Sequence, residues 1–180
     1  MFTGKGRGMT IVEILIALAI LAIIAAVVLP TTAGQLRQGH AAALANQLAN
    51  LRDAIGNYRQ NVGAYPRFLT QLTNQPVAGA VGACGANLSN PELNDWRGPY
   101  LNQNIVGDVP VGSAIVVSQL TRTVAGTAEL LQIRAARVEN DIASDLEEQF
   151  DGNADFATGT ILWTAAGDDT LTFQIPIRGC

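Results

Sequence analysis

Hydrophobic residues form one unbroken stretch near the N-terminus and periodic patterns farther along the chain. Residues 14–29 contain no polar side chain. As a helix, residues 9–29 extend roughly 30 Å, close to the thickness of the hydrocarbon core of a bilayer. This stretch predicts a membrane-spanning segment at 9–29.

Beyond Pro30 the apolar positions are spaced four and three residues apart, which places them on one helical face: Leu44, Leu48, Leu51, Ile55 and Tyr58. The pattern predicts one long helix over residues 10–61, apolar all round in its first half and amphipathic in its second. Pro30 and Gly34 predict a soft joint between the halves. Pro66 disfavours helical geometry at the residue before it, so the helix is expected to end at 62–66.

The sequence after the long helix predicts a sheet. Residues 67–112 are rich in Gly, Asn and Pro, and indicate loop with short helical pieces. Segments rich in Val, Ile or Leu around turn signals predict four strands: 113–121, 128–135, 160–164 and 170–177. Helical spacing in an acidic segment between them predicts a short surface helix: Val138, Ile142, Leu146 and Phe150. We therefore expect an α+β fold, one long helix packed on a four-stranded antiparallel sheet, because the helix cannot bury its apolar face alone.

Charge and motifs exclude two classes of function. The net charge is −4, with 11 basic and 15 acidic residues, and no Lys/Arg cluster is interleaved with aromatic residues. No nucleic-acid partner is therefore predicted. His40 is the only histidine, and no GxSxG, HExxH or P-loop sequence occurs. The chain is not expected to be an enzyme.

The segment before the apolar run, residues 1–8, is short, polar and basic. Lys5 and Arg7 are expected to hold it in the cytoplasm, which places the chain after Pro30 on the far side of the membrane. A secretory signal peptide would have a small-residue cleavage site after its apolar stretch, and residues 30–34 offer no A-x-A site.

Glu13 is the anomaly of the apolar segment. A carboxylate inside a membrane helix is unfavourable by several kcal/mol, so it marks a function and needs a partner. The predicted span contains no cation. A cut after Gly8 would place a new α-amino group on Met9 at about the same depth, where a neighbouring subunit could present it to Glu13.

The residues 5–8 (KGRG), 9–13 (MTIVE) and the apolar run closely resemble the class III leader of type IV pilins and type II secretion pseudopilins. The resemblance implies that a prepilin peptidase cuts after Gly8 and that Met9 is then methylated. It makes Glu13 the fifth mature residue, where the family keeps a glutamate. It places Pro30 where type IV pilins commonly have a helix-loosening proline. Met9 departs from the usual phenylalanine.

The resemblance also implies a domain organisation: a leader at 1–8, a transmembrane and filament-core helix at 9–29, and a globular head at 30–180. The expected function is a structural subunit of a type IV filament. Such a subunit is first a single-pass inner-membrane protein with a cytoplasmic N-terminus, then part of a periplasmic or cell-surface filament. Its partners would be copies of itself, other pilin-like subunits, prepilin peptidase and the inner-membrane assembly platform. The alternatives are an ordinary signal anchor and a non-polymerising, membrane-anchored periplasmic binding protein.

Two features point to different branches of the family. Residues 65–66 (YP) and 95–101 (DWRGPYL) resemble segments of secretion pseudopilins, whereas a C-terminal Cys180 is typical of type IV pilins. The choice between pilus and secretion system stays open. Trp96 and Tyr100 are expected to fasten their loop to the head, and a ligand cage is the alternative.

Two further sites are predicted with alternatives. Cys84 and Cys180 form no CxxC pair, and behind a membrane-insertion signal they predict a disulfide, with two free buried thiols as the alternative. Asp151, Asn153 and Asp155 have the D-x-N-x-D spacing that opens a calcium loop, and some pseudopilins bind calcium near the C-terminus. Phe156 stands where the loop needs glycine and Leu162 where it needs a bidentate acid, so an Asx-rich turn is the alternative.

Overall fold

The computed structural model describes residues 10–180 except positions 104, 153, 154, 166 and 168, and it describes no side chains for residues 27–33. The chain divides into two compact units, Met1–Gln38 (unit 1) and Gly39–Cys180 (unit 2).

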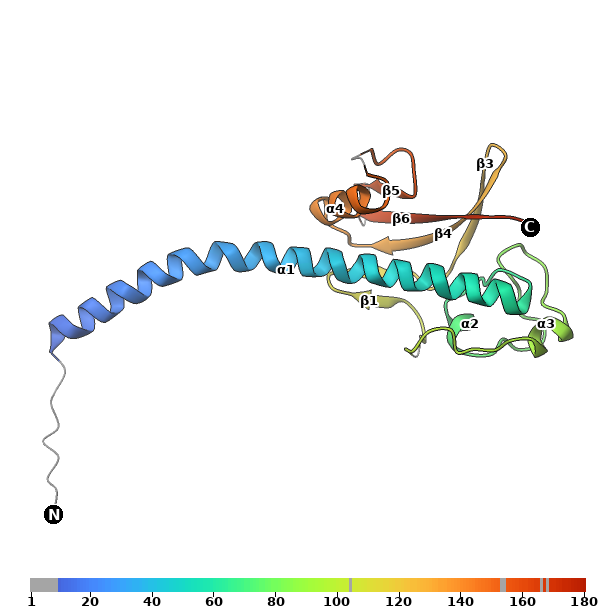
Figure 1. The fold of residues 1–180 in the computed structure, drawn as a ribbon, viewed down its shortest axis with the longest axis horizontal. Coiled ribbons are helices and arrows are strands. Elements are labelled where there is room, and N and C mark those ends of the chain that lie inside the picture. The colour runs from blue at the N-terminus through green and yellow to red at the C-terminus, as the bar shows by residue number, and fades with distance from the viewer. Residues whose placement is uncertain (1–9, 104, 153–154, 166, 168) are drawn as a thin grey trace, which may run out of the picture. The chain divides into compact units, whose positions relative to one another are not determined.

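Helix α1 is the element that the two units share. It runs over Ile11–Val62, and its helical backbone continues through Pro30 and Gly34 (Figure 1). The predicted helix over 10–61 is therefore confirmed. It ends where Gly63 adopts a left-handed φ of 82° and its amide donates to the Arg59 carbonyl at 3.0 Å. A left-handed glycine just after the last turn is a common helix stop.

Unit 2 contains one antiparallel sheet of six strands. In chain order they are β1 Val109–Val111, β2 Ala114–Val116, β3 Thr121–Ala125, β4 Ala128–Ala136, β5 Ile161–Thr164 and β6 Thr170–Ile177. The spatial order is β1-β2-β4-β6-β5, and β3 also pairs with β4 (Figure 1). The α+β class with a long helix on an antiparallel sheet is confirmed, but the sheet has six strands and not the four predicted.

The predicted strand at 113–121 was wrong in its extent. β2 ends at Val116, which pairs with Ala135 near the end of β4, and β3 begins at Thr121, which pairs with Gln132 in the middle of β4. The Val117 amide still donates to the Arg134 carbonyl of β4 at 2.8 Å. Residues 118–120 pair with an earlier loop instead, because the Leu69 amide donates to the Ser118 carbonyl and the Leu120 amide to the Arg67 carbonyl, both at 2.8 Å.

The core of unit 2 lies between the amphipathic part of α1 and the sheet. The five periodic residues of α1, from Leu44 to Tyr58, are at most 1% exposed. They belong to the same buried cluster as the apolar side chains of the sheet: Leu131, Ile133, Ile161, Leu171 and Phe173. Helix α4, Asn140–Phe150, adds Ile142 and Leu146 to this cluster. The predicted surface helix is confirmed.

The loop before the sheet contains α2, Thr70–Thr73, and α3, Asn90–Asn94. Trp96 donates from its indole nitrogen to the Gln71 carbonyl at 3.0 Å. The Tyr100 ring meets both the Trp96 and Tyr58 rings edge-on, with centroids 5.7 and 5.6 Å apart. The two aromatic residues therefore fasten the loop to the head, as predicted.

Candidate functional site

The first turn of α1 carries the candidate assembly residue, Glu13. Its amide donates to the Thr10 hydroxyl at 3.3 Å, and the Thr10 amide donates to the Glu13 carboxylate at 3.5 Å. This reciprocal pair is a capping box, which satisfies two backbone amides that a helix start leaves unpaired. Thr10 is thus a residue that our sequence analysis missed, although the Thr-x-x-Glu spacing signals it.

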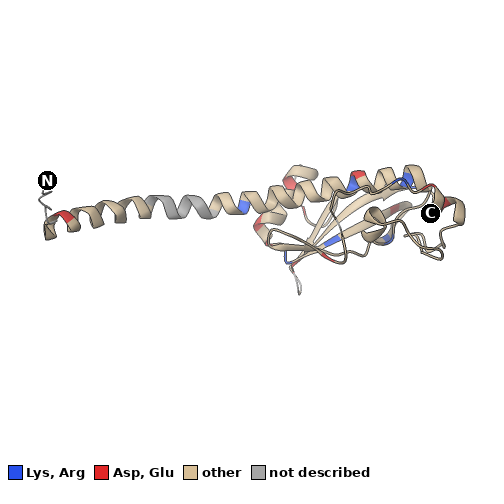
Figure 2. Ribbon diagram, turned by 90° about the horizontal axis from the view of Figure 1, so that it is seen from below, with Lys and Arg blue, Asp and Glu red and all other residues tan. Residues whose placement is uncertain are grey.

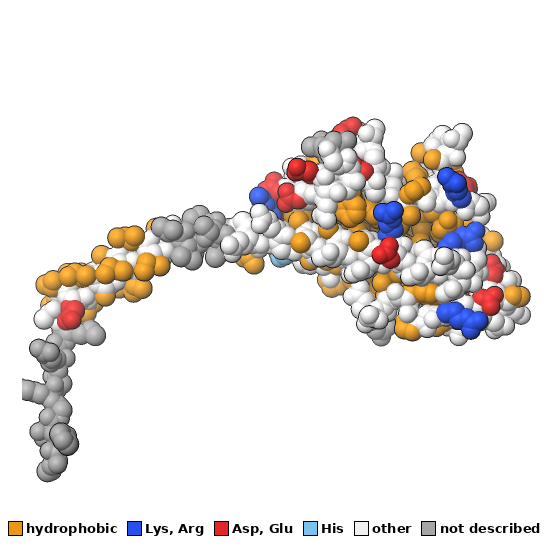
Figure 3. Space-filling view, in the orientation of Figure 1, with side chains coloured by type: hydrophobic (Ala, Val, Ile, Leu, Met, Phe, Trp, Pro, Cys, Tyr) orange, Lys and Arg blue, Asp and Glu red, His pale blue; other side chains and the backbone are white. Residues whose placement is uncertain are grey.

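The side chains that follow Thr10 are apolar and exposed all round the helix. Ile11 is 78% exposed, and the large residues after it are also exposed, by 46% or more: Val12, Ile14, Leu15, Ile16, Leu18, Ile20, Leu21, Ile23 and Ile24. Figure 3 shows them as a continuous orange surface. Glu13 is the only charged residue between positions 10 and 26. Soluble proteins rarely expose so much contiguous apolar surface, so this surface is expected to be shielded from water by a membrane or by other protein chains.

Within the part of the chain that the structure describes, no helix is both long enough and apolar enough to cross a membrane.

Gly8 and Met9 lie outside the described residues, and Pro30 is placed as helical backbone only. The structure therefore brings Glu13 together with Thr10 but does not test its pairing with Met9. Cleavage at Gly8, methylation at Met9 and the role of Pro30 stay predictions.

The second candidate site lies at the C-terminus of the chain. Cys84 and Cys180 form a disulfide, with their Cα atoms 5.3 Å apart, and no described cysteine is free. The Arg178 amide also donates to the Tyr65 hydroxyl at 3.3 Å. The disulfide prediction is confirmed, and the free-thiol alternative is wrong.

Asp151 organises the connection between α4 and β5. One of its carboxylate oxygens accepts from the amides of Thr160 at 2.7 Å and Ile161 at 2.8 Å. Burial alone would raise the pKa of Asp151, but these two amides and the Thr160 side chain together outweigh burial and hold that pKa below its usual value. Gly159 has a left-handed φ of 114°, and a Cβ there would lie 2.6 Å from the Asp151 carboxylate. The close approach therefore requires glycine.

Asp155 forms a local turn. Its carboxylate accepts from the Ala157 amide at 3.1 Å and from the Thr158 hydroxyl at 2.9 Å. These bonds are typical of an Asx turn. Asn153 lies outside the described residues, and among those described no three acidic, histidine or cysteine residues gather closely enough to hold a metal ion. Calcium at this loop stays a prediction.

Glu147 is a second residue that our sequence analysis missed. It is 0% exposed, and neither of its carboxylate oxygens has a hydrogen-bond partner. Burial raises the pKa of Glu147 to about 6, and the charges of Asp151 and Asp155 add to the effect. Its position four residues after the buried Ala143 indicates that it faces inward, since residues four apart share a helical face.

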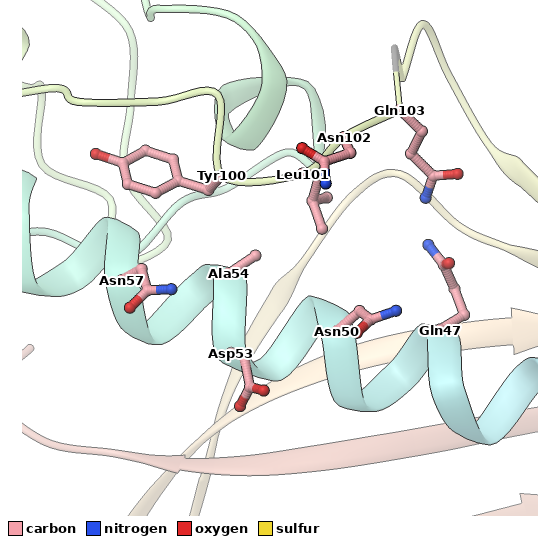
Figure 4. A pocket seen from close by; sticks show the side chains of 9 residues that line it. All are labelled: Gln47, Asn50, Asp53, Ala54, Asn57, Tyr100, Leu101, Asn102 and Gln103. Atoms are coloured by element: carbon pink, nitrogen blue, oxygen red, sulfur yellow. The ribbon is translucent and has the colours of Figure 1, made fainter.

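A recess of about 400 Å³ lies between the polar side of α1 and the loop that follows Trp96 (Figure 4). Its lining consists of carboxamides, one carboxylate and three other side chains: Gln47, Asn50, Asp53, Ala54, Asn57, Tyr100, Leu101, Asn102 and Gln103. Asp53 has no second acid, histidine or cysteine beside it in this lining. The recess thus offers no acid–base pair for catalysis.

Comparison with known proteins gave one match. The family described as "Prokaryotic N-terminal methylation motif" matches residues 4–29. No curated protein and no solved structure matches the chain. A motif of this kind is a class III signal, which implies recognition by prepilin peptidase and anchoring in the inner membrane through the N-terminal helix before assembly. Proteins that carry this methylation motif are generally not enzymes.

The matched residues include Gly8, Met9 and Glu13, and the exposed apolar surface of α1 begins within them. The fold that follows is a long helix on an antiparallel sheet, as in pilins. This chain is therefore a prepilin-like protein that carries the N-methylation motif typical of the type IV pilin and pseudopilin family.

Proposed function

We propose that this chain is a structural subunit of a type IV filament, either a type IV pilin or a type II secretion pseudopilin. Prepilin peptidase would cut it after Gly8, and Met9 would then be N-methylated. One observation carries the proposal. Glu13 is the single carboxylate in residues 11–26 of α1, whose other side chains are all apolar and exposed, and it lies inside the matched motif.

In this proposal the exposed apolar surface is shielded from water first by the membrane and then by neighbouring subunits. Before assembly, residues 9–29 lie in the inner membrane, with Lys5 and Arg7 on the cytoplasmic side. After assembly, the same surface packs against the equivalent helices of neighbouring subunits. The Cys84–Cys180 disulfide supports this orientation, because disulfides persist on the oxidising side of the membrane.

Glu13 provides a reason for ordered assembly. Its contact with the Thr10 amide neutralises no charge, so the carboxylate remains an unfavourable group in an apolar environment. The α-amino group of Met9 from a neighbouring subunit would supply an opposite charge and a charge-assisted hydrogen bond. This pairing would also fix the axial register of apolar helices that otherwise slide past one another.

The test is to express Glu13→Ala or Glu13→Asp as the only copy and to count filaments by shearing and microscopy. We expect few or no filaments from Glu13→Ala and a partial defect in Glu13→Asp, whose carboxylate is one methylene shorter. The amount in the membrane fraction should be unchanged, because insertion does not use the carboxylate.

Two controls separate assembly from processing. Glu139→Ala removes an exposed carboxylate from unit 2 and should leave the filament count unchanged. Mass spectrometry should show a methylated N-terminus at Met9 in the wild type and in both Glu13 variants. A mature chain that begins at Met1 or beyond Leu29 would contradict the proposal, as would a wild-type filament count from Glu13→Ala.

A further inference from the structure

Acidic residues of unit 2 cluster around α4. The segment from Glu139 to Asp155 contains seven acidic residues and no Lys or Arg: Glu139, Asp141, Asp145, Glu147, Glu148, Asp151 and Asp155. Figure 3 shows acidic side chains gathered over α4, and most of the basic ones on the part of unit 2 nearer the C-terminus. Figure 2 shows that acidic residues also lie among the basic ones toward the C-terminus.

The sheet register places these two groups at opposite ends of the β4–β6 ladder. Ala135 pairs with Leu171 at the end of β4 that leads to α4, whereas Glu129 pairs with Ile177 at the other end. Arg178 follows β6 there, and its amide contacts Tyr65. The Arg59 guanidinium lies over the Tyr65 ring, 5.1 Å from its centroid. A strand as long as β6 extends roughly 25 Å, which separates the two ends.

The basic end contains a groove of about 650 Å³ between α1 and β6. We call it the arginine groove, and six of its lining residues define it: Arg52, Arg59, Gln60, Tyr65, Ile175 and Pro176. Asp53 also lines it. Arg52 is exposed and Arg59 half-buried, and neither forms an ion pair with a described residue. The groove therefore presents two guanidinium groups that can each accept a carboxylate partner.

The opposite end presents two acidic side chains on one face of a helix. Asp145 and Glu148 are exposed and lie three residues apart on α4, while the other side of the helix is buried in the core. We call these two residues the acidic face. Their charges are opposite to those of Arg52 and Arg59 in the arginine groove.

We propose that the arginine groove of one subunit binds the acidic face of a second copy of this chain. The inference rests on the proposed filament function and adds a contact between the folded parts of the subunits. The two surfaces lie at opposite ends of unit 2, so the contact is head-to-tail and need not close into a dimer. Contacts of this kind generate open helical assemblies. Because the pairs are exposed, they weaken as salt is raised.

The first test reverses charge in the full-length chain. Arg52→Glu with Arg59→Glu, or Asp145→Arg with Glu148→Arg, should each lower the filament yield about tenfold, because like charges then face each other. All four changes in one chain should restore the yield, since the complementarity is reversed on both sides. Arg134→Glu is the matched control, an exposed arginine outside both surfaces. Wild-type yield from both charge-reversed pairs would overturn the proposal.

The second test detects the contact without requiring filaments. One preparation of the full-length chain carries Arg52→Cys and another carries Asp145→Cys. Both are purified in detergent, mixed and treated with a short bifunctional thiol reagent. The reagent reacts only with the introduced cysteines, because Cys84 and Cys180 are already bonded to each other. A cross-linked dimer should form in the mixture and not from either variant alone, and 0.5 M salt should reduce it several-fold.

The outcomes separate the two proposals. Cross-linking in the mixture with no filaments in cells would contradict the proposed function and support this contact. Filaments in cells without the mixed dimer would support the function and overturn the contact. In cells, cross-linking of Arg52→Cys to a protein of a different mass would also overturn it, because the occupant of the groove would then be another subunit.

Discussion

The carboxylate of Glu147 is a buried acid to which the fold gives no hydrogen bond. Such a group is more stable when protonated, and its pKa rises from 4.5 to about 6 because of burial and the nearby Asp151 and Asp155. Between these two pH values the folded chain keeps a proton that the unfolded chain has lost. The stability that this group contributes is therefore fully present below pH 4.5 and is lost as pH rises through 6.

Glu147→Gln should remove this pH dependence. We expect the free energy of unfolding of the variant, relative to wild type, to rise by roughly 1–2 kcal/mol between pH 4.5 and 7.5. Urea denaturation of the full chain at several pH values measures the difference. Glu148→Gln changes an exposed neighbour and serves as the control. A constant difference across the pH range would show that Glu147 does not titrate as inferred.

At the scale of elements, Asp151 joins α4 to β5 through two backbone amides. Asp151→Ala would leave the Thr160 and Ile161 amides without an acceptor, which should lower the free energy of unfolding by about 2–4 kcal/mol. Asp151→Asn keeps a side-chain oxygen, so its loss should be smaller. Thermal or urea unfolding measures both. Equal losses for the two variants would show that charge matters here and hydrogen bonding does not.

The elements also show how far the sequence predicts this fold. α1 and α4 were predicted because their apolar positions repeat with helical spacing and one face is buried. β1 was missed because a three-residue strand with Pro110 at its centre reads as loop. The division of the predicted 113–121 strand depends on hydrogen bonds to residues 67–69, and pairing so distant in sequence leaves no local pattern.

The candidate site was predictable to a similar degree. Glu13 stood out because a charge in an apolar run is rare, and the pairing of Cys84 with Cys180 follows from there being no other cysteine. The buried state of Glu147 was not predicted, because acidic residues surround it in the sequence and only packing distinguishes it from the exposed Glu148. The arginine groove was not predicted because Ile175 and Pro176 reach it from the other end of the chain.

At the scale of the whole molecule, the disulfide joins residues 96 positions apart and closes a loop of about two thirds of unit 2. Cys180→Ser should lower the free energy of unfolding by about 2–4 kcal/mol, since a loop near 100 residues restricts the unfolded chain. Cys84→Ser should have the same effect, and the double variant should lose no more than either single one. Denaturation with and without reductant checks this, and additive losses would indicate that the two cysteines act separately.

The position of β6 constrains when this protein folds. β6 is the last strand of the chain, yet it lies between β4 and β5 and pairs with both. The sheet has a gap in its middle until residues 170–177 pair with both neighbours. The long helix and the earlier strands are therefore synthesised before the sheet can be completed. A chain truncated before β6 would leave the facing edges of β4 and β5 without a partner, and unpaired edges of this kind invite aggregation.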